Sequence, residues 1–297
     1  MSVTVRVPAK VNVQLAVGAA RPDGFHDLAN VFLAVGLYDE VTVTPAEELR
    51  ITCAGPDAAE VPLDRTNLAA RAAIALAERR GIDPAVHLHI AKDIPVAGGM
   101  AGGSADGAGA LLACDALWGT GASREELLEI CAELGSDVPF SLVGGAALGT
   151  GRGEKLRTLE VGGGFSWVFA MAERGLSTPA VFREFDRLTE GLDVPEPVAS
   201  EALLDALAGG DPDALAAAVS NDLQPAALSL FPELADTLAA GSAAGALAGL
   251  VSGSGPTTAF LARDAGAAAE IADALRASGT CRTVRVASGP APGATVL

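Results

Sequence analysis

The chain of 297 residues contains few lysines, cysteines and aromatic residues. Its four cysteines lie far apart and form no C-x-x-C pair, so we expect buried free thiols and neither a disulfide framework nor a zinc site. No segment reaches the roughly 18 consecutive apolar residues that a membrane-spanning helix needs. The first ten residues, MSVTVRVPAK, alternate apolar and polar side chains, which is typical of a strand and not of a signal peptide. We therefore expect a soluble protein of the cytoplasm.

Positive charge is also scarce, because 20 Lys and Arg stand against 37 Asp and Glu, a formal net charge of −17. This balance argues against nucleic acids and anionic membranes as partners, since both need basic side chains spread over one face. It still allows a small anionic ligand, because a few local donors and a divalent cation can outweigh the global field at one site.

The length favours two domains. The alternation over residues 3–17 predicts a strand that Pro8 interrupts, at an edge position or a bulge that tolerates a missing N–H. Apolar spacing predicts helices over residues 66–80 and 104–119, with a strand between them. From about residue 162 a new strand and several helices follow. We place an N-terminal nucleotide-binding domain over residues 1–155 and a smaller α+β domain over residues 156–297.

The segment IPVAGGMAGGSADGAGALL (residues 94–112) has glycines at 98, 99, 102, 103, 107 and 109, before and within a predicted helix. Bare backbone N–H groups and a helix N-terminus favour an anion, and phosphate is the natural one. The segment is no P-loop and no Rossmann turn, because the chain has neither a Gly-Lys dipeptide nor a G-x-G-x-x-G motif. The alternative is a tight turn with close helix packing. The many glycines, with Ser104 and Asp106 at the helix start, favour an anion site.

Phosphoryl transfer also needs a cation and a carboxylate. Lys10 is one of only three lysines and lies between apolar residues in the first predicted strand. Asp137 follows a predicted helix end and precedes the apolar run VPFSLV, where a carboxylate is expected to be partly buried and paired. A lysine on a solvated strand face and a helix-capping aspartate are the alternatives. The run from Ser252 to Gly255 is either a second phosphate-facing loop or a glycine turn.

Three segments, in chain order, resemble the signatures of the GHMP small-molecule kinases. PAKVNVQLAVGAARPDGFHDLANVF resembles the first signature and contains the R-x-D-G-[YF]-H run of the branch that acts on 4-diphosphocytidyl-2-C-methyl-D-erythritol. IPVAGGMAGGSADGAGALL resembles the nucleotide loop, and VSGSGPTTAFL resembles the third signature. The resemblance implies a two-domain α+β GHMP kinase architecture, with a ribosomal protein S5 domain 2-like N-terminal domain and a ferredoxin-like C-terminal domain. It places the site in the cleft between them.

The resemblance also implies an activity: transfer of the γ-phosphoryl group of ATP, with Mg²⁺, to the 2-hydroxyl of this cytidyl diphosphate in the non-mevalonate isoprenoid precursor pathway. Asp137 would take the hydroxyl proton, and Lys10 would keep Asp137 ionised and stabilise the transferring group. His26 would bind cytosine between the rings of Phe25 and Phe182. The acceptor contacts it implies are Asn12, Phe25, His26, Thr178, Phe182, Ser252 and Gly253. The ATP contacts are Pro95, Val96, Ala97, Gly98, Gly99, Met100, Ala101, Gly102, Gly103, Ser104 and Ala105 at the phosphates, with Asn67 and Lys92 at the adenosine.

Three residues depart from the family pattern. Ala97 and Ala101 replace glycines, and a methyl group predicts a negative φ at both. Asp106 replaces a common asparagine and would repel phosphate unless it faces Mg²⁺ or a hydrogen-bond donor, so no metal ligand is assigned.

Two alternatives stay open. One is a GHMP kinase of the homoserine or mevalonate type, which has no need of His26 and Phe25. The other is a catalytically silent nucleotide-binding protein, whose sequence sign would be loss of Lys10 or Asp137. The sequence assigns no oligomeric state.

Overall fold

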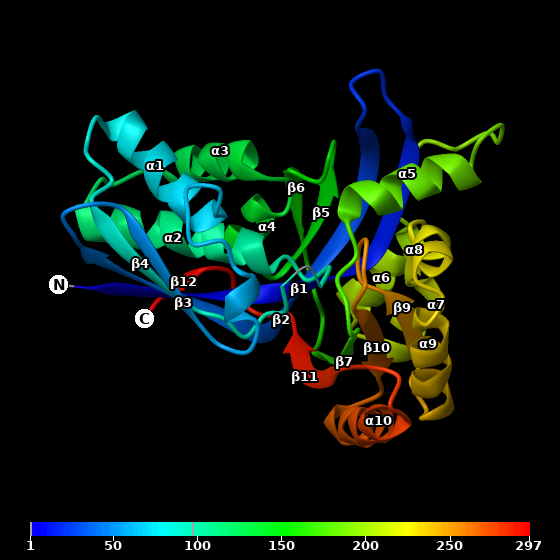
Figure 1. The fold of residues 1–297 in the computed structure, drawn as a ribbon. Helices are drawn as coiled ribbons and strands as arrows, with labels where there is room; N and C mark the ends of the chain where they lie inside the picture. The colour runs from blue at the N-terminus through cyan, green and yellow to red at the C-terminus, as the bar shows by residue number, and fades with distance from the viewer. Residues whose placement is uncertain (1, 97) are drawn as a thin grey trace.

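The computed structural model describes residues 2–96 and 98–297, which form two α+β units, each built on its own sheet (Figure 1). The first unit contains an eight-stranded sheet with the main order β12-β1-β2-β4-β3. β5 pairs with β2, β6 with β5, and β8 with β1. The strands of this sheet are β1 (Val3–Ala20), β2 (His26–Pro45), β3 (Arg50–Ala54), β4 (Val86–Ala91), β5 (Ala146–Thr150), β6 (Lys155–Leu159), β8 (Ser220–Asn221) and β12 (Thr295–Val296).

The long β1-β2 hairpin connects the sheet to the site. Its register shifts between Pro8 and Ala9, which confirms the bulge predicted at Pro8. Pro8 pairs with Tyr38 of β2, and the strands on the other side of β1 reach only Val5, Arg6, Gln14 and Leu15. The hairpin reaches across to the second unit, where its turn at residues 21–25 lies near α5 (Figure 1).

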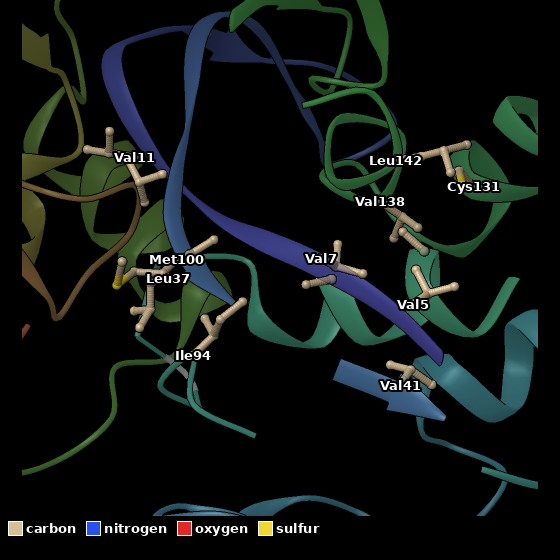
Figure 2. Packing of buried hydrophobic residues seen from close by; sticks show 14 of the residues in the cluster. Val5, Val7, Val11, Leu37, Val41, Ile94, Met100, Cys131, Val138 and Leu142 are labelled. Carbon is tan, nitrogen blue, oxygen red and sulfur yellow. The ribbon is translucent and has the colours of Figure 1, made fainter. Parts of the chain in front are cut away.

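Four helices cover one face of the first sheet: α1 (Leu68–Arg80), α2 (Gly102–Trp118), α3 (Arg124–Leu134) and α4 (Val138–Val143) (Figure 1). α2 packs closely on β1 and β2 because Gly109 has no side chain; a Cβ there would lie 2.8 Å from Val7 and 2.9 Å from Val41. The core between helices and sheet also includes Ile94 and Met100 from the glycine-rich segment (Figure 2). The part of the segment from Ile94 to Met100 is therefore anchored in the core at both of its ends.

The second unit has a four-stranded antiparallel sheet in the order β11-β7-β10-β9. The four strands have the ferredoxin-like order: five helices and the short β8 lie between β7 and β9, β9 leads directly to β10, and one helix lies between β10 and β11, which confirms the prediction. The strands are β7 (Phe165–Met171), β9 (Ala248–Val251), β10 (Thr258–Ala262) and β11 (Thr283–Gly289). The helices are α5 (Thr178–Leu188), α6 (Glu201–Gly209), α7 (Pro212–Ala218), α8 (Gln224–Leu230), α9 (Leu234–Ala243) and α10 (Ala265–Ser278).

Two short helices, α4 and α8, were not expected from the sequence. Each is only two turns or less and has a proline at its start, so its apolar residues give no helical period long enough to recognise. α4 matters most, because Asp137 is its N-cap residue.

The pairings of the first sheet extend past the predicted boundary after residue 155. β6 begins at Lys155 and pairs with β5, and the chain end returns to β1 as β12. Within residues 2–96 and 98–297, no helix has both the length and the apolarity to cross a membrane. All four cysteines are free; Cys114 and Cys131 are buried as expected, whereas Cys53 and Cys281 are half-buried.

Candidate active site

A cavity of about 660 Å³ lies where the hairpin, the glycine-rich segment, α4, α5 and the loop after β9 meet. It brings together residues that the sequence places up to 240 positions apart, from Lys10 to Gly253. Most of the predicted site residues line it: Lys10, Asn12, Phe25, His26, Gly98, Gly99, Ala101, Gly102, Gly103, Ser104, Asp137, Thr178, Phe182 and Gly253.

The remaining predicted residues that the structure describes do not line this cavity. Pro95 and Val96 line a separate hollow of about 70 Å³, and Met100, Ala105 and Ser252 are buried beneath the surface. Asn67 caps α1: its Oδ1 accepts from Ala69 N at 2.8 Å and its Nδ2 donates to Pro62 O at 2.7 Å. Ala97 lies outside the described residues.

The N-terminus of α2 forms one end of the cavity, through Gly102, Gly103 and Ser104. Ala101 is the N-cap residue and provides no side-chain hydrogen bond to the first turn. The N–H groups that begin a helix have no partner within it, so they are open to an anion together with the helix dipole. This geometry suits a phosphate group.

The prediction of a negative φ at Ala101 is wrong. Ala101 has φ 61° and ψ 30°, the left-handed region, and is the one non-glycine residue with positive φ among those described. Tertiary contacts hold the segment in this shape: Lys10 N donates to Met100 O at 3.3 Å, and Gly99 O accepts two side-chain hydrogen bonds. They override a local preference of about 1–2 kcal/mol.

The glycines of this segment serve both of the purposes considered from the sequence. Gly99 has φ +73°, and a Cβ there would lie 2.1 Å from Ser252 O, so only glycine fits between the two loops. Gly102 and Gly103 line the cavity. Gly107 and Gly109 lie against Leu68 and against Val7 and Val41, so these two allow close helix packing.

Lys10 and Asp137 form an ion pair in the cavity, with 3.6 Å between Lys10 Nζ and Asp137 Oδ2. Lys10 is buried and also donates to Asn12 Oδ1 and, at 2.8 Å, to Gly99 O. Burial lowers the pKa of Lys10 below its usual 10.5, while the Asp137 carboxylate acts to raise it. Asp137 is about one-third exposed and faces the cavity, so its carboxylate is accessible to a ligand.

The loop after β9 completes this arrangement. Ser252 Oγ donates to Gly99 O at 3.1 Å, and Asn221 Nδ2 donates to Gly253 O at 2.8 Å. Gly253 has φ +59°, and a Cβ there would lie 3.0 Å from Asn12 Oδ1 and 3.3 Å from Lys10 Nζ. The three sequence signatures therefore meet at Gly99 and Lys10.

His26 lies at the other end of the cavity. Its Nδ1 contacts Gly18 O at 2.8 Å, and since a carbonyl only accepts, Nδ1 carries the hydrogen. The other ring nitrogen, Nε2, lies 3.4 Å from Asp186 Oδ1, and this nitrogen is an acceptor in any neutral imidazole whose Nδ1 carries the hydrogen. The ring stacks on Phe182, with 5.1 Å between centroids.

Arg152, Arg183 and Asp186 also line the cavity, and sequence reasoning missed them. The Arg152 guanidinium lies 5.1 Å from the centroid of the half-exposed Phe25 ring, because Leu28 N donates to Gly151 O and joins the two loops. Arg183 and Asp186 are on α5, a helix whose exposed charges are not distinctive in sequence. With Lys10, the two arginines make the cavity locally richer in cations than in carboxylates, although the whole chain is acidic.

Asp106 faces a donor, which resolves the question its sequence position raised. Its Oδ2 accepts from Lys92 Nζ at 2.8 Å, and Lys92 Nζ also donates to Asp39 Oδ2 at 2.5 Å. All three side chains are buried. Lys92, predicted at the adenosine, is thus held beneath the glycine-rich segment by two carboxylates.

An open helix N-terminus and a Lys-Asp pair in the wall of one cavity are the groups that phosphoryl transfer to a small molecule needs. Comparison with known families agrees: residues 67–145 match the GHMP kinases N terminal domain and residues 203–281 match the GHMP kinases C terminal domain. The chain belongs to the GHMP kinase family, as its sequence predicts.

Its most similar relatives reported below share one name within the family. The chain is 84% identical, over the full length of both proteins, to 4-diphosphocytidyl-2-C-methyl-D-erythritol kinase of Streptomyces avermitilis. It is 61% identical to the enzyme of that name from Thermobifida fusca, covering 100% of this chain and 98% of that one. A crystal structure of 4-(cytidine 5'-diphospho)-2C-methyl-D-erythritol kinase matches with TM-score 0.77 at 34% identity, over 96% of this chain and 98% of the other. A homoserine kinase from Cytophaga hutchinsonii also has TM-score 0.77, over 100% of this chain and 97% of that one, but at 21% identity it shows the fold alone.

Proposed function

We propose that this kinase phosphorylates the 2-hydroxyl of 4-diphosphocytidyl-2-C-methyl-D-erythritol, the acceptor named for its relatives, in the non-mevalonate isoprenoid precursor pathway. The observation that carries the proposal is the single cavity in which the Lys10-Asp137 pair and the α2 N-terminus share a wall with the His26 ring. One end suits the phosphates of ATP, and the other end suits a nucleobase.

In this mechanism the phosphates of ATP bind at the N–H groups of Gly102, Gly103 and Ser104. Asp137 accepts the proton of the acceptor hydroxyl while the hydroxyl oxygen forms a bond to the γ-phosphorus of ATP. The bond between the γ-phosphorus and the β-phosphate oxygen breaks, which releases ADP. Lys10 keeps Asp137 ionised and neutralises charge on the transferring group. Asn12 holds the Lys10 ammonium in place.

Cytosine selection follows from the two acceptors at the far end of the cavity. His26 Nε2 and Asp186 Oδ1 are 3.4 Å apart, and neither carries a hydrogen when His26 is neutral. The exocyclic amino group of cytosine has two N–H donors and would satisfy both acceptors. Uracil has a carbonyl oxygen at that position, which cannot donate a hydrogen bond. His26 Nε2 and Asp186 Oδ1 would then face a third acceptor without a donor between them, and polar sites discriminate strongly against such a ligand. Phe25 and Phe182 provide ring faces on which the base would stack. The Arg152 guanidinium lies over the Phe25 ring, so it would move away when a base stacks there.

We propose Mg²⁺ as the cation that accompanies ATP. In the described part of the chain, no three His, Cys, Asp or Glu side chains lie close enough to hold a metal. That fits a cation bound mainly by phosphate oxygens and water, which is the usual state of Mg²⁺ in kinases. When bound it would neutralise charge on the phosphates. The expectations that the protein binds neither nucleic acid nor membranes, and that it is cytoplasmic, stay predictions.

The test is a purified protein with Mg-ATP and the cytidyl acceptor, followed by ADP release and by phosphorus NMR of the product. We expect one new phosphomonoester on the 2-oxygen, and a much lower rate with the uridyl analogue. Homoserine and mevalonate serve as the competing acceptors of the alternative GHMP kinases. Turnover of either of them in preference to the cytidyl compound, or a folded protein without turnover, contradicts the proposal.

A further inference from the structure

A buried cluster of three ionisable side chains lies directly under the phosphate end of the cavity. Asp39 is on β2, Lys92 follows β4 and Asp106 is in α2, so the cluster joins two strands of the sheet to the helix. Asp39 is 0% exposed, and Lys92 and Asp106 are 3% exposed. Charges buried this deeply are costly unless a specific arrangement holds them, and they carry little net stabilisation even when paired.

Each member contacts a different part of the glycine-rich segment. Asp39 Oδ1 accepts from Asp93 N at 2.7 Å and from Ile94 N at 2.8 Å, the two residues that lead into the segment. Lys92 Nζ lies 2.9 Å from the position that a Cβ on Gly102 would occupy, directly below the first residue of α2. Asp106 Oδ2 accepts from Lys92 Nζ and so connects the second turn of α2 to the same cation.

The cluster leaves one of its own buried polar atoms without a hydrogen bond, so hydrogen bonding within the cluster does not explain its presence. Asp106 Oδ1 is buried without a hydrogen-bond partner among the described residues. An apolar trio of the same volume would fill this space without that cost. What an apolar trio would not supply is the pair of acceptors for the backbone at residues 93 and 94, or a positive charge under the helix N-terminus.

We propose that Asp39, Lys92 and Asp106 form a positioning triad for the phosphates of the nucleotide. Asp39 sets where the segment leaves the sheet. Lys92 brings its ammonium nitrogen closer to Gly102 than either carboxylate, so the positive end of the ion pair acts at the start of α2. Asp106 holds Lys92 there. The triad touches no substrate and acts through the backbone and the field at the start of α2. The proposal rests on the proposed function only in naming ATP as the nucleotide.

The test compares the variant Asp106→Asn with the double variant Lys92→Met, Asp106→Asn. Asparagine keeps an oxygen that accepts from Lys92, so the difference between the two variants isolates the lysine. Both variants keep Asp39. In the double variant it is a buried carboxylate held only by the N–H groups of Asp93 and Ile94, so the thermal unfolding of each variant is measured beside its binding. Exposed Lys155→Met is the matched control for loss of a lysine elsewhere.

Binding of a non-hydrolysable ATP analogue and of cytidine diphosphate would be measured separately by calorimetry, with thermal unfolding alongside. We expect the double variant to bind the ATP analogue about tenfold more weakly than Asp106→Asn, equivalent to about 1.4 kcal/mol. Its affinity for cytidine diphosphate should match that of Asp106→Asn, because His26 is at the other end of the cavity.

Equal affinity of the two variants for the ATP analogue would overturn the proposal. Equal losses for both ligands would also overturn it, because they would indicate general loosening of the fold. These binding measurements need no turnover, so they distinguish failure of the triad from failure of the proposed acceptor.

Discussion

Replacing Ala101 by glycine should stabilise the protein, although glycine destabilises a helix interior. Ala101 has φ 61°, and a left-handed alanine costs about 1–2 kcal/mol relative to a right-handed one. Glycine removes that cost but gains about 0.5–1 kcal/mol of unfolded-chain entropy. The difference leaves a net stabilisation of about 0.5–1 kcal/mol, which raises Tm by about 1–4 °C for a chain of this size.

Thermal unfolding followed by calorimetry measures this change, with Ala75→Gly as the matched control. Ala75 is half-buried in the middle of α1, where the same substitution should lower stability by about 1 kcal/mol. The same Ala→Gly change should raise stability at position 101 and lower it at position 75. Because the side chain removed is the same, the difference in sign reports on backbone conformation. A lower Tm for Ala101→Gly would refute the reasoning, because it would mean that the methyl group contributes packing worth more than the strain.

Three further predictions concern the site. Asp137→Asn should lower kcat by about 10²- to 10⁴-fold, the usual contribution of a general base, with ATP-analogue affinity retained; unchanged turnover in a steady-state assay would remove Asp137 from the mechanism. Gly253→Ala should lower kcat by about tenfold or more, about 1.4 kcal/mol, because φ is +59° and the new methyl group would press on Asn12 and Lys10; wild-type kinetics would show that the loop adjusts freely. Burial raises the pKa of Asp106 to about 8 from 3.8, so its proton contributes stability that is present at low pH and lost as pH rises through about 8. The urea midpoint should therefore fall less between pH 6 and pH 9 in Asp106→Asn than in the wild type, and parallel slopes would contradict the buried protonated carboxyl.

Much of the fold and site could be predicted because the signals are local. The alternation of β1 and the bulge at Pro8 each depend on neighbouring residues. The same holds for the glycine-rich segment, whose composition alone indicates a phosphate site. The cation and the carboxylate of the site were recognisable because Lys10 and Asp137 are unusual for the segments in which they occur.

Other parts depend on residues that are distant in sequence. Arg152 reaches Phe25 only because Leu28 pairs with Gly151, and Asp186 faces His26 only because α5 packs against the hairpin turn. No spacing in the sequence reports such contacts. The conformation of Ala101 is the clearest example, because its own preference favours negative φ and hydrogen bonds to Met100 and Gly99 override it.

The sequence by itself determined the family through its three signature segments, and it predicted the α+β class and a phosphate site in the glycine-rich segment, because these depend on neighbouring residues. Only the tertiary structure decided which glycines face the cavity and which pack the helix, and that Asp106 accepts a hydrogen bond from Lys92. Those outcomes depend on which side chain lies opposite each position after folding. In a packed interior, that is a property of the whole chain.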